Sequence, residues 1–192
     1  MRPLPRRFYD RDTEQVARDL LGAVLETTLG GVRCRGRIVE TEAYLGEHDP
    51  ACHAVVGRTP RTDPLYGPPG TAYVYFVYGM HWCVNAVTRA AGLPSAVLIR
   101  AVEPLEGLET MRARRPRARS DRTLADGPAK LCQAMGITGA LNRASLLAGP
   151  LRILEGTRIP EAQVRVTSRI GITKAADWPL RWLAVRTARS RR

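Results

Sequence analysis

Two carboxylates and a phenol alternate along one stretch of the chain, where Glu40, Glu42 and Tyr44 occupy every second position. If this stretch is a β-strand, its alternate residues share one face, so the three side chains point to the same side. A carboxylate in a partly enclosed site is a common means of activating a water molecule, but burial would demand partners for it. The alternative is a strand edge that shows the same carboxylates to solvent.

An aromatic run, Tyr73-Val-Tyr-Phe-Val-Tyr78, is the second chemical pattern. On a strand, Tyr73 and Tyr75 face one way and Tyr78 faces the other, beside a turn at Gly79-Met80. An aromatic side chain near a hairpin tip is either a core anchor or a wedge that enters a base step. Aromatic platforms also hold unstacked bases.

The charge of the chain is strongly positive, with 30 Lys and Arg against 18 Asp and Glu, a net charge of +12. All of the basic residues except Lys130 and Lys174 are arginines. Because the guanidinium fork suits phosphate oxygens and base edges, this balance favours a nucleic-acid partner. Arginine usage can also follow genomic base composition, so the charge alone leaves the partner open.

The cysteines lack the paired spacing of zinc ligands. The four cysteines are single, without a C-x-x-C pair to accompany histidines in a zinc site. We therefore expect no structural zinc, and we expect reduced, buried thiols. The cysteines are Cys34, Cys52, Cys83 and Cys132, and the histidines are His48, His53 and His81.

The length of 192 residues suits one domain, and we expect 1–192 to form it. No stretch approaches the roughly 20 apolar residues of a membrane span, and residues 1–12 carry charges where a signal peptide would be apolar. An intracellular protein without membrane contact is the expectation, in the cytoplasm or nucleoid if the source is bacterial. The arginine-rich segments 112–122 and 187–192 are expected to be flexible.

The elements that must position these residues follow from periodicity and turn residues. Helices are predicted over Thr13–Leu21, from Pro104 past Met111, and from Pro128 through Met135. Strands are predicted at 23–28, 32–44, 71–78, 81–88, 96–102, 151–154, 164–167 and 182–186. The long aperiodic stretch 45–70 is typical of a functional loop. The predicted fold is a single α+β domain with a curved, mostly antiparallel sheet, flanking helices and a protruding hairpin.

Six blocks of the sequence together resemble one protein family, the alkyladenine (3-methyladenine) DNA glycosylases of base-excision repair. They span most of 17–172 in the right order, which is far more specific than a single short motif. The blocks are Ala17-Arg-Asp-Leu-Leu-Gly22, Arg37-Ile-Val-Glu-Thr-Glu-Ala-Tyr-Leu-Gly46, Pro69-Gly-Thr-Ala-Tyr-Val-Tyr-Phe-Val-Tyr-Gly-Met80, Cys83–Asn85, Leu98–Met111 and Gly127-Pro-Ala-Lys-Leu-Cys-Gln-Ala134.

The resemblance implies a monofunctional enzyme that binds the DNA minor groove, flips a damaged purine out of the duplex and hydrolyses its N-glycosidic bond without a metal or other cofactor. In this reading Glu42 is the general base that deprotonates the attacking water. Arg100 helps to hold that water and the phosphate of the target nucleotide. The product is an abasic site without strand cleavage, and the enzyme is expected to act as a monomer.

The same resemblance assigns the positions that contact DNA. Five residues are assigned to the flipped base: Tyr44, His53, Tyr75, Asn85 and Ile170. The rings of Tyr44, His53 and Tyr75 stack on the base, and the Asn85 amide excludes guanine. The main chains of His53 and Ile170 contact base edges. Tyr78 fills the gap left in the duplex. Met80, Lys130 and Gly171 are assigned to the DNA backbone.

The expected substrates are alkylated purines such as 3-methyladenine and 7-methylguanine, with deaminated purines such as hypoxanthine also open. One alternative is a metal-dependent nuclease that binds magnesium through Glu40, Glu42 and Asp49. Another is a noncatalytic nucleic-acid-binding module in which the tyrosines only stack. Sensitivity to chelators separates the first alternative, and indifference to Glu42→Gln separates the second.

Overall fold

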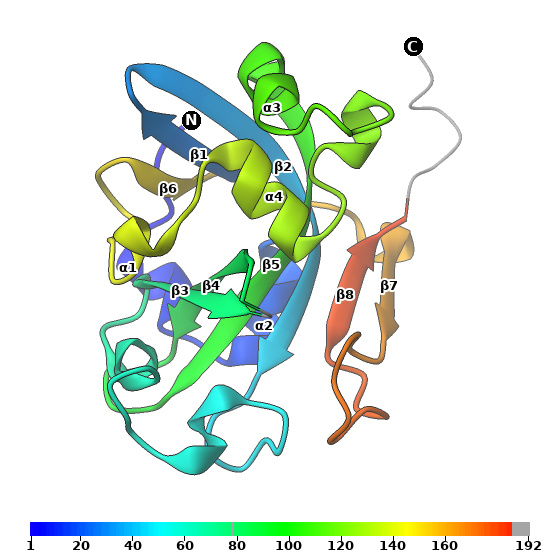
Figure 1. The fold of residues 1–192 in the computed structure, drawn as a ribbon. Coiled ribbons are helices and arrows are strands. Elements are labelled where there is room, and N and C mark those ends of the chain that lie inside the picture. The colour runs from blue at the N-terminus through cyan, green and yellow to red at the C-terminus, as the bar shows by residue number, and fades with distance from the viewer. Residues whose placement is uncertain (78, 186–192) are drawn as a thin grey trace.

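An open antiparallel sheet carries the fold in the computed structural model, which describes residues 1–77 and 79–185 (Figure 1). The main path runs β3-β4-β5-β2-β1-β6, with β8 beside β2 and β7 beside β8. Among the described residues, the eight strands are β1 Val24–Leu29, β2 Val32–Tyr44, β3 Ala72–Val77, β4 His81–Thr88, β5 Ser95–Glu106, β6 Leu151–Leu154, β7 Val164–Thr167 and β8 Arg181–Ala184.

Short helices accompany the sheet, which makes the fold α+β as predicted. The α-helices are α1 Arg6–Tyr9, α2 Thr13–Asp19, α3 Leu108–Arg114 and α4 Pro128–Met135. The 3-10 helices are η1 His53–Val56, η2 Asp63–Tyr66, η3 Asp121–Thr123, η4 Gly139–Leu141 and η5 Glu161–Gln163. No helix in the part of the chain that the structure describes is long and apolar enough to cross a membrane.

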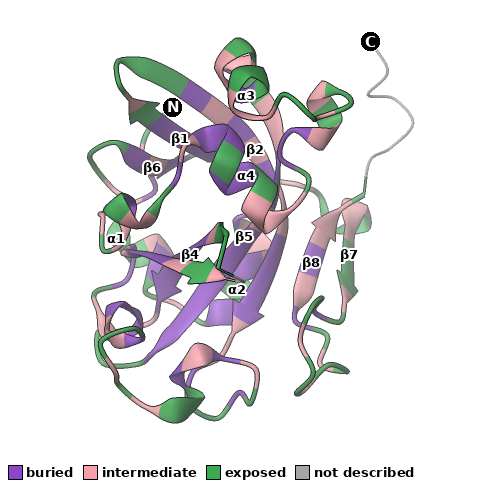
Figure 2. Cartoon of the chain, viewed as in Figure 1, coloured by how far each residue is buried: buried purple, intermediate pink, exposed green. Residues whose placement is uncertain are grey.

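The two faces of the sheet are covered by different helices. Thr41 of β2 points toward α2, where its hydroxyl donates a hydrogen bond to the carbonyl of Ala17 at 2.8 Å. Helix α4 packs against β4 and β5 in front of the sheet, as Figure 1 shows. Figure 2 shows that the strands between these layers are largely buried. One large apolar cluster joins both helices to the sheet, so the chain forms a single domain.

Strand β2 is the central strand of the site because it pairs with three other strands. Its first half pairs with β1, residues 40–42 pair with β8, and its other edge pairs with β5. The β2–β5 ladder is irregular near its middle: Glu40 pairs with Ala101 and Thr41 with Ile99. Arg100 is thus an extra residue on β5. Such bulges bend a strand and redirect side chains, often beside active sites.

Several predicted elements are confirmed, and some of their boundaries differ from the prediction. Helix α2 begins at Thr13 as predicted, after Asp12, whose carboxylate accepts hydrogen bonds from two backbone N–H groups, but it ends at Asp19 and not at Leu21. No helix begins at Pro104, because β5 continues to Glu106. Pro104 pairs with Gly36 beside a register shift, a place where a strand tolerates proline.

The arginine-rich stretch 112–122 contains the end of one helix and the start of another. Helix α3 extends through Arg114, and Arg112 forms an ion pair with Asp121, which begins η3. Strand β8 ends at Ala184 and not at Arg186. Residues 186–192, which include the predicted flexible tail, lie outside the described residues.

The hairpin of β3 and β4 is confirmed by its antiparallel register, in which Val77 pairs with His81. Trp82 of this hairpin packs against Phe76, with ring centroids 4.6 Å apart. A Cβ atom at Gly139 would lie 2.5 Å from the Trp82 ring, so only glycine allows η4 to approach it. Tyr78 lies outside the described residues. Protrusion of the hairpin and its insertion into DNA stay predictions.

Candidate active site

Glu42 lies near the end of β2 with its side chain fully buried. Both of its oxygens have donors. The Tyr44 hydroxyl donates to Oε2 at 3.0 Å, and the backbone N–H of Ile170 donates to Oε1 at 2.8 Å. The face shared by Glu42 and Tyr44 therefore points into the protein, and the alternative of a solvent-facing strand edge is wrong for Glu42.

Arg100 approaches Glu42 from the bulge in β5. Its Nη1 lies 3.2 Å from Glu42 Oε2, and its Nε donates to Glu40 Oε1 at 2.8 Å. Arg181 of β8 also donates to Glu40 Oε1, at 2.6 Å. Burial lowers the pKa of Arg100, but the carboxylates of Glu42 and Glu40 together raise it by more than burial lowers it. The guanidinium is therefore held charged. Glu40 acts as the anchor that aims Arg100 at Glu42.

A cavity of about 360 Å³ opens beside these groups. Its volume lies in the range of small-ligand sites. Strands β3, β4 and β5, the stretch that follows β2, the start of α4 and the 168–172 loop all contribute to its wall, and many of the lining side chains are apolar or aromatic. Its lining includes Tyr44, His53, Tyr73, Tyr75, Cys83, Asn85, Leu98, Arg100, Pro128, Ile170 and Gly171.

The sheet register explains why residues distant in sequence meet at this cavity. Tyr73 pairs with Asn85, Asn85 with Leu98, and Leu98 with Glu42, which places one residue from each of four strands in a row. The Asn85 amide donates to the Tyr73 carbonyl at 3.1 Å, so its side chain is fixed within the wall.

His53 and Tyr75 meet edge to face on another side of the cavity, with ring centroids 4.5 Å apart and an interplanar angle of 75°. His53 Nδ1 lies 2.9 Å from the Tyr73 hydroxyl. Burial, and then the nearby Arg61 cation, lower the pKa of His53 below 6.5, while burial raises the pKa of Tyr73 to about 12. Both rings are therefore neutral near pH 7.

The structure brings most of the predicted site residues together. Tyr44, His53, Tyr75, Asn85, Arg100, Ile170 and Gly171 line the cavity, and Glu42 lies behind its wall.

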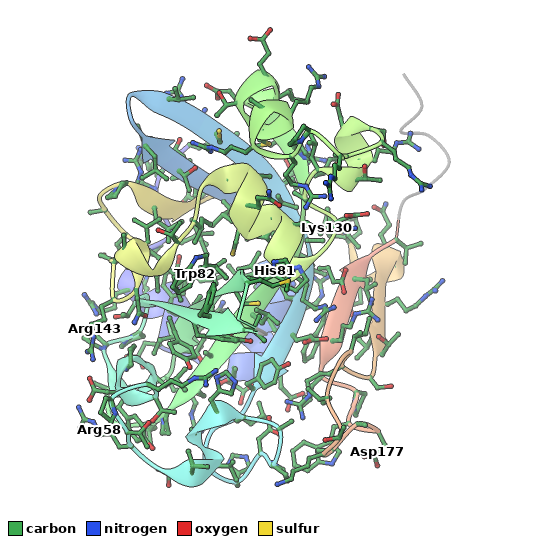
Figure 3. All side chains as sticks on the ribbon, in the orientation of Figure 1. Arg58, His81, Trp82, Lys130, Arg143 and Asp177 are labelled. Atoms are coloured by element: carbon green, nitrogen blue, oxygen red, sulfur yellow. The ribbon has the colours of Figure 1, made fainter. Side chains whose placement is uncertain are left out.

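The other predicted positions either do not line the cavity or lie outside the described residues. Lys130, labelled in Figure 3, belongs to α4, and its ammonium pairs with Asp126 at 2.8 Å. Met80 is exposed at the turn between β3 and β4. Tyr78, the predicted intercalating residue, lies outside the described residues.

Comparison with known proteins now identifies the chain's family. Residues 7–188 match the model of the methylpurine-DNA glycosylase family. The chain belongs to this family. A protein of Myxococcus xanthus named "Putative 3-methyladenine DNA glycosylase" is 52% identical over 175 residues, which are 91% of this chain and 84% of that protein. Proteins of the same name from Methanocella arvoryzae (51% identity; 93% of this chain, 88% of that protein) and Carboxydothermus hydrogenoformans (48% identity; 93% of each) are similar.

The family membership confirms the resemblance found in the sequence. This member of the methylpurine-DNA glycosylase family is a hydrolytic DNA glycosylase for alkylated bases, with DNA as its substrate and base-excision repair as its setting. The cavity beside Glu42 is the candidate active site of the glycosylase.

The glycosylase also contains a buried ion pair that the sequence did not predict. Arg169 and Asp49 have fully buried side chains, and Arg169 Nη2 donates to Asp49 Oδ1 at 2.9 Å. The sequence offers Asp49 only as a magnesium ligand of the alternative nuclease. The two residues lie 120 positions apart, and no spacing in the sequence relates them.

The carboxylates considered as magnesium ligands are each engaged by arginine. Glu40 contacts Arg100 and Arg181, Glu42 contacts Arg100, and Asp49 contacts Arg169. Within residues 1–77 and 79–185, no group of three or more His, Cys, Asp and Glu side chains is arranged to hold a metal ion.

Proposed function

We propose that this glycosylase flips alkylated purines out of duplex DNA and hydrolyses their N-glycosidic bonds, with Glu42 as the general base. The expected substrates are 3-methyladenine and 7-methylguanine; a neutral deaminated purine such as hypoxanthine would also need an acid to protonate it, and its release stays open to the test below. The observation that supports this most directly is the Glu42 carboxylate, held by Tyr44, Ile170 and Arg100 behind an aromatic cavity.

The chemistry needs a fixed carboxylate near the C1′ atom of the flipped nucleotide. Departure of the base leaves an oxocarbenium-like sugar, which a carboxylate stabilises while it directs water at C1′, as in glycoside hydrolysis. Two hydrogen-bond donors, one on each oxygen, and the Arg100 cation fix the orientation of Glu42 in advance. Arg100, aimed by Glu40, is placed to hold the water or the phosphate of the target nucleotide.

Base selection would rest on the rings and the amide of the cavity. A purine alkylated at N3 or N7 is cationic, so it leaves without an acid and stacks well on electron-rich rings. Tyr44, His53 and Tyr75 supply those rings, and neutral His53 does not repel a cationic base. Asn85, fixed by its hydrogen bond to the Tyr73 carbonyl, would disfavour guanine by a clash with its exocyclic amino group, a penalty that 7-methylguanine shares and that its ready departure as a cationic base offsets.

The resemblance assigns main-chain contacts with the base to His53 and Ile170, and the hydrogen bond of Ile170 limits which of its main-chain groups can make one. The N–H of Ile170 is occupied by Glu42, so a base-edge contact from this residue falls to its carbonyl. The contact proposed for the main chain of His53 at the base edge is supported by the position of His53 in the cavity lining.

Duplex binding in this proposal relies on a wedge and on cations. Tyr78 fills the space of the flipped nucleotide, and Met80, Lys130 and Gly171 contact the backbone. The net charge of +12 adds nonspecific affinity, with a salt dependence that steepens by about one log-log unit for each phosphate contact. The enzyme works as a monomer.

The test uses duplexes that carry a single 7-methylguanine or hypoxanthine, incubated with the protein and a chelator and then heated in alkali. Strand breaks that require alkali show base release without strand cleavage. Breaks before alkali that disappear with chelator would instead indicate a metal-dependent nuclease. Binding without any base release would indicate the noncatalytic module.

A further inference from the structure

The Arg169–Asp49 pair is the most completely buried pair of opposite charges among the described residues, with both side chains at 0% exposure. Besides its bond from Nη2, Arg169 donates from Nη1 to Asp49 Oδ2 at 2.5 Å and to the Ala43 carbonyl at 3.1 Å. Neither side chain lines the base cavity. The direct chemistry proposed for Glu42 therefore does not use them.

A buried ion pair of this kind is a poor device for stability alone. Removing two charges from water is costly, and well-packed apolar residues often replace such pairs at no loss. The burial of Asp49 raises its pKa, but hydrogen bonds from Arg169 and from the backbone of Leu45 and Ala51 outweigh this and lower it. Both groups therefore remain charged near pH 7.

The pair joins three segments that surround Glu42. Asp49 belongs to the loop after β2, the Ala43 carbonyl belongs to β2 itself, and Arg169 belongs to the loop that connects β7 with β8. With one side chain, Arg169 fixes the distance between the end of β2 and the 168–172 loop.

Both non-arginine donors to Glu42 depend on this connection. Ile170, whose N–H donates to Glu42, is the next residue after Arg169. Tyr44, whose hydroxyl donates to the other oxygen, has its ring 4.7 Å from the Arg169 guanidinium carbon. The guanidinium thus contacts one donor through the chain and the other through its ring.

We propose that Arg169 and Asp49 are positioning residues for base excision, which hold Ile170 N–H and the Tyr44 hydroxyl on the Glu42 carboxylate. This proposal rests on the function proposed for Glu42. The pair touches neither the DNA nor the reacting atoms, and it acts by keeping the carboxylate in its productive orientation. Small errors in such an orientation cost up to about 100-fold in rate.

The test compares Asp49→Asn and Arg169→Lys with the unchanged enzyme under single-turnover conditions, on a duplex with one 7-methylguanine. Asp49→Asn keeps the shape of the side chain, and Arg169→Lys keeps its charge. Duplex affinity is measured in parallel on DNA with a stable abasic analogue, and folding by thermal denaturation. Glu26→Gln is the matched control, because Glu26 is a buried carboxylate held by Arg35 and Arg152 away from the cavity.

Each variant is also made together with Tyr44→Phe. If the pair acts through the donors on Glu42, base release slows by roughly 10- to 100-fold with duplex affinity within about threefold, and the loss in the Tyr44→Phe background is much smaller. Glu26→Gln is expected to lower thermal stability and leave the rate within about twofold.

Three outcomes would overturn the positioning role in favour of a structural one. They are equal losses of rate with and without Tyr44→Phe, unchanged rates in both pair variants, and a failure of both variants to fold. A parallel Glu42→Gln enzyme keeps the two proposals apart. If Glu42→Gln releases base as fast as the unchanged enzyme, the proposed function itself is wrong.

Discussion

The backbone N–H of Ile170 donates a 2.8 Å hydrogen bond to Oε1 of Glu42, although the two residues are 128 positions apart. A main-chain donor persists whatever side chain the residue carries, proline excepted, so this hydrogen bond depends on the shape of the 168–172 loop. This dependence makes the loop's geometry directly testable.

Gly171→Ala is expected to slow base release. Gly171 has a φ of +76°, where an L side chain is strained by about 1 kcal/mol, and a shift of the loop would move Ile170 away from Glu42. The measurement is the single-turnover rate, with a decrease of about fivefold to tenfold expected. Gly149→Ala is the matched control, because Gly149 has a φ of +88° and also has open space around it, but lies outside the cavity. Equal slowing in both variants would contradict the role of the loop.

Glu40→Gln is expected to lower the rate of base release by roughly tenfold, because a charge-assisted hydrogen bond of about 1.5–3 kcal/mol that aims Arg100 is lost. The measurement is again the single-turnover rate. Glu106→Gln serves as the control, since Glu106 pairs with Arg33 and Arg35 at the far end of β5. An unchanged rate in Glu40→Gln would show that Arg100 needs no anchor.

His53 is expected to titrate below 6.5, because burial and the Arg61 cation both disfavour its protonated form. Imidazole resonances followed by NMR against pH measure this pKa, and His53→Gln identifies the signal. Arg61→Gln is expected to raise the pKa of His53. A midpoint at or above 6.5 would contradict the effect of burial and of Arg61 on this imidazole.

Glu26→Gln is expected to reduce the dependence of stability on pH in acid. Burial raises the pKa of Glu26, but Arg35 and Arg152 outweigh burial and lower it below 4.5 in the folded protein. The unfolded chain therefore binds the proton first as pH falls, so this stabilisation is complete above about 4.5 and is lost through the folded-state pKa. Urea unfolding between about pH 3 and 7 measures the effect. Identical pH slopes for both proteins would contradict it.

The sequence predicted the strands well where alternation and turn residues agree. The bounds of β2, β4, β6 and β7 match the structure because polar or glycine-rich turns delimit them. The error at Pro104 has a physical cause: proline usually stops a strand, but here a register shift opposite Gly36 accommodates it. The short helix α1 was missed, since four residues are too few to show a period.

The site was predictable where residues are close in sequence or carry the family pattern, as with Glu42, Tyr44 and the tyrosines of β3. The partners of Glu40 and Asp49 were not, because strand register and a bulge bring Arg100, Arg181 and Arg169 to them. The alternating pattern correctly placed Glu40 and Glu42 beside one another. It could not show that the same arginine contacts both.

The most direct test of the account is the rate of base release by Glu42→Gln under single-turnover conditions, measured on a duplex with one 7-methylguanine together with the affinity for the same duplex. The substitution keeps the size of the side chain and removes its charge. We predict a fall of at least about 100-fold in rate with nearly unchanged affinity, as expected when a general base is lost. A rate equal to that of the unchanged enzyme would contradict the assignment of Glu42 as the base.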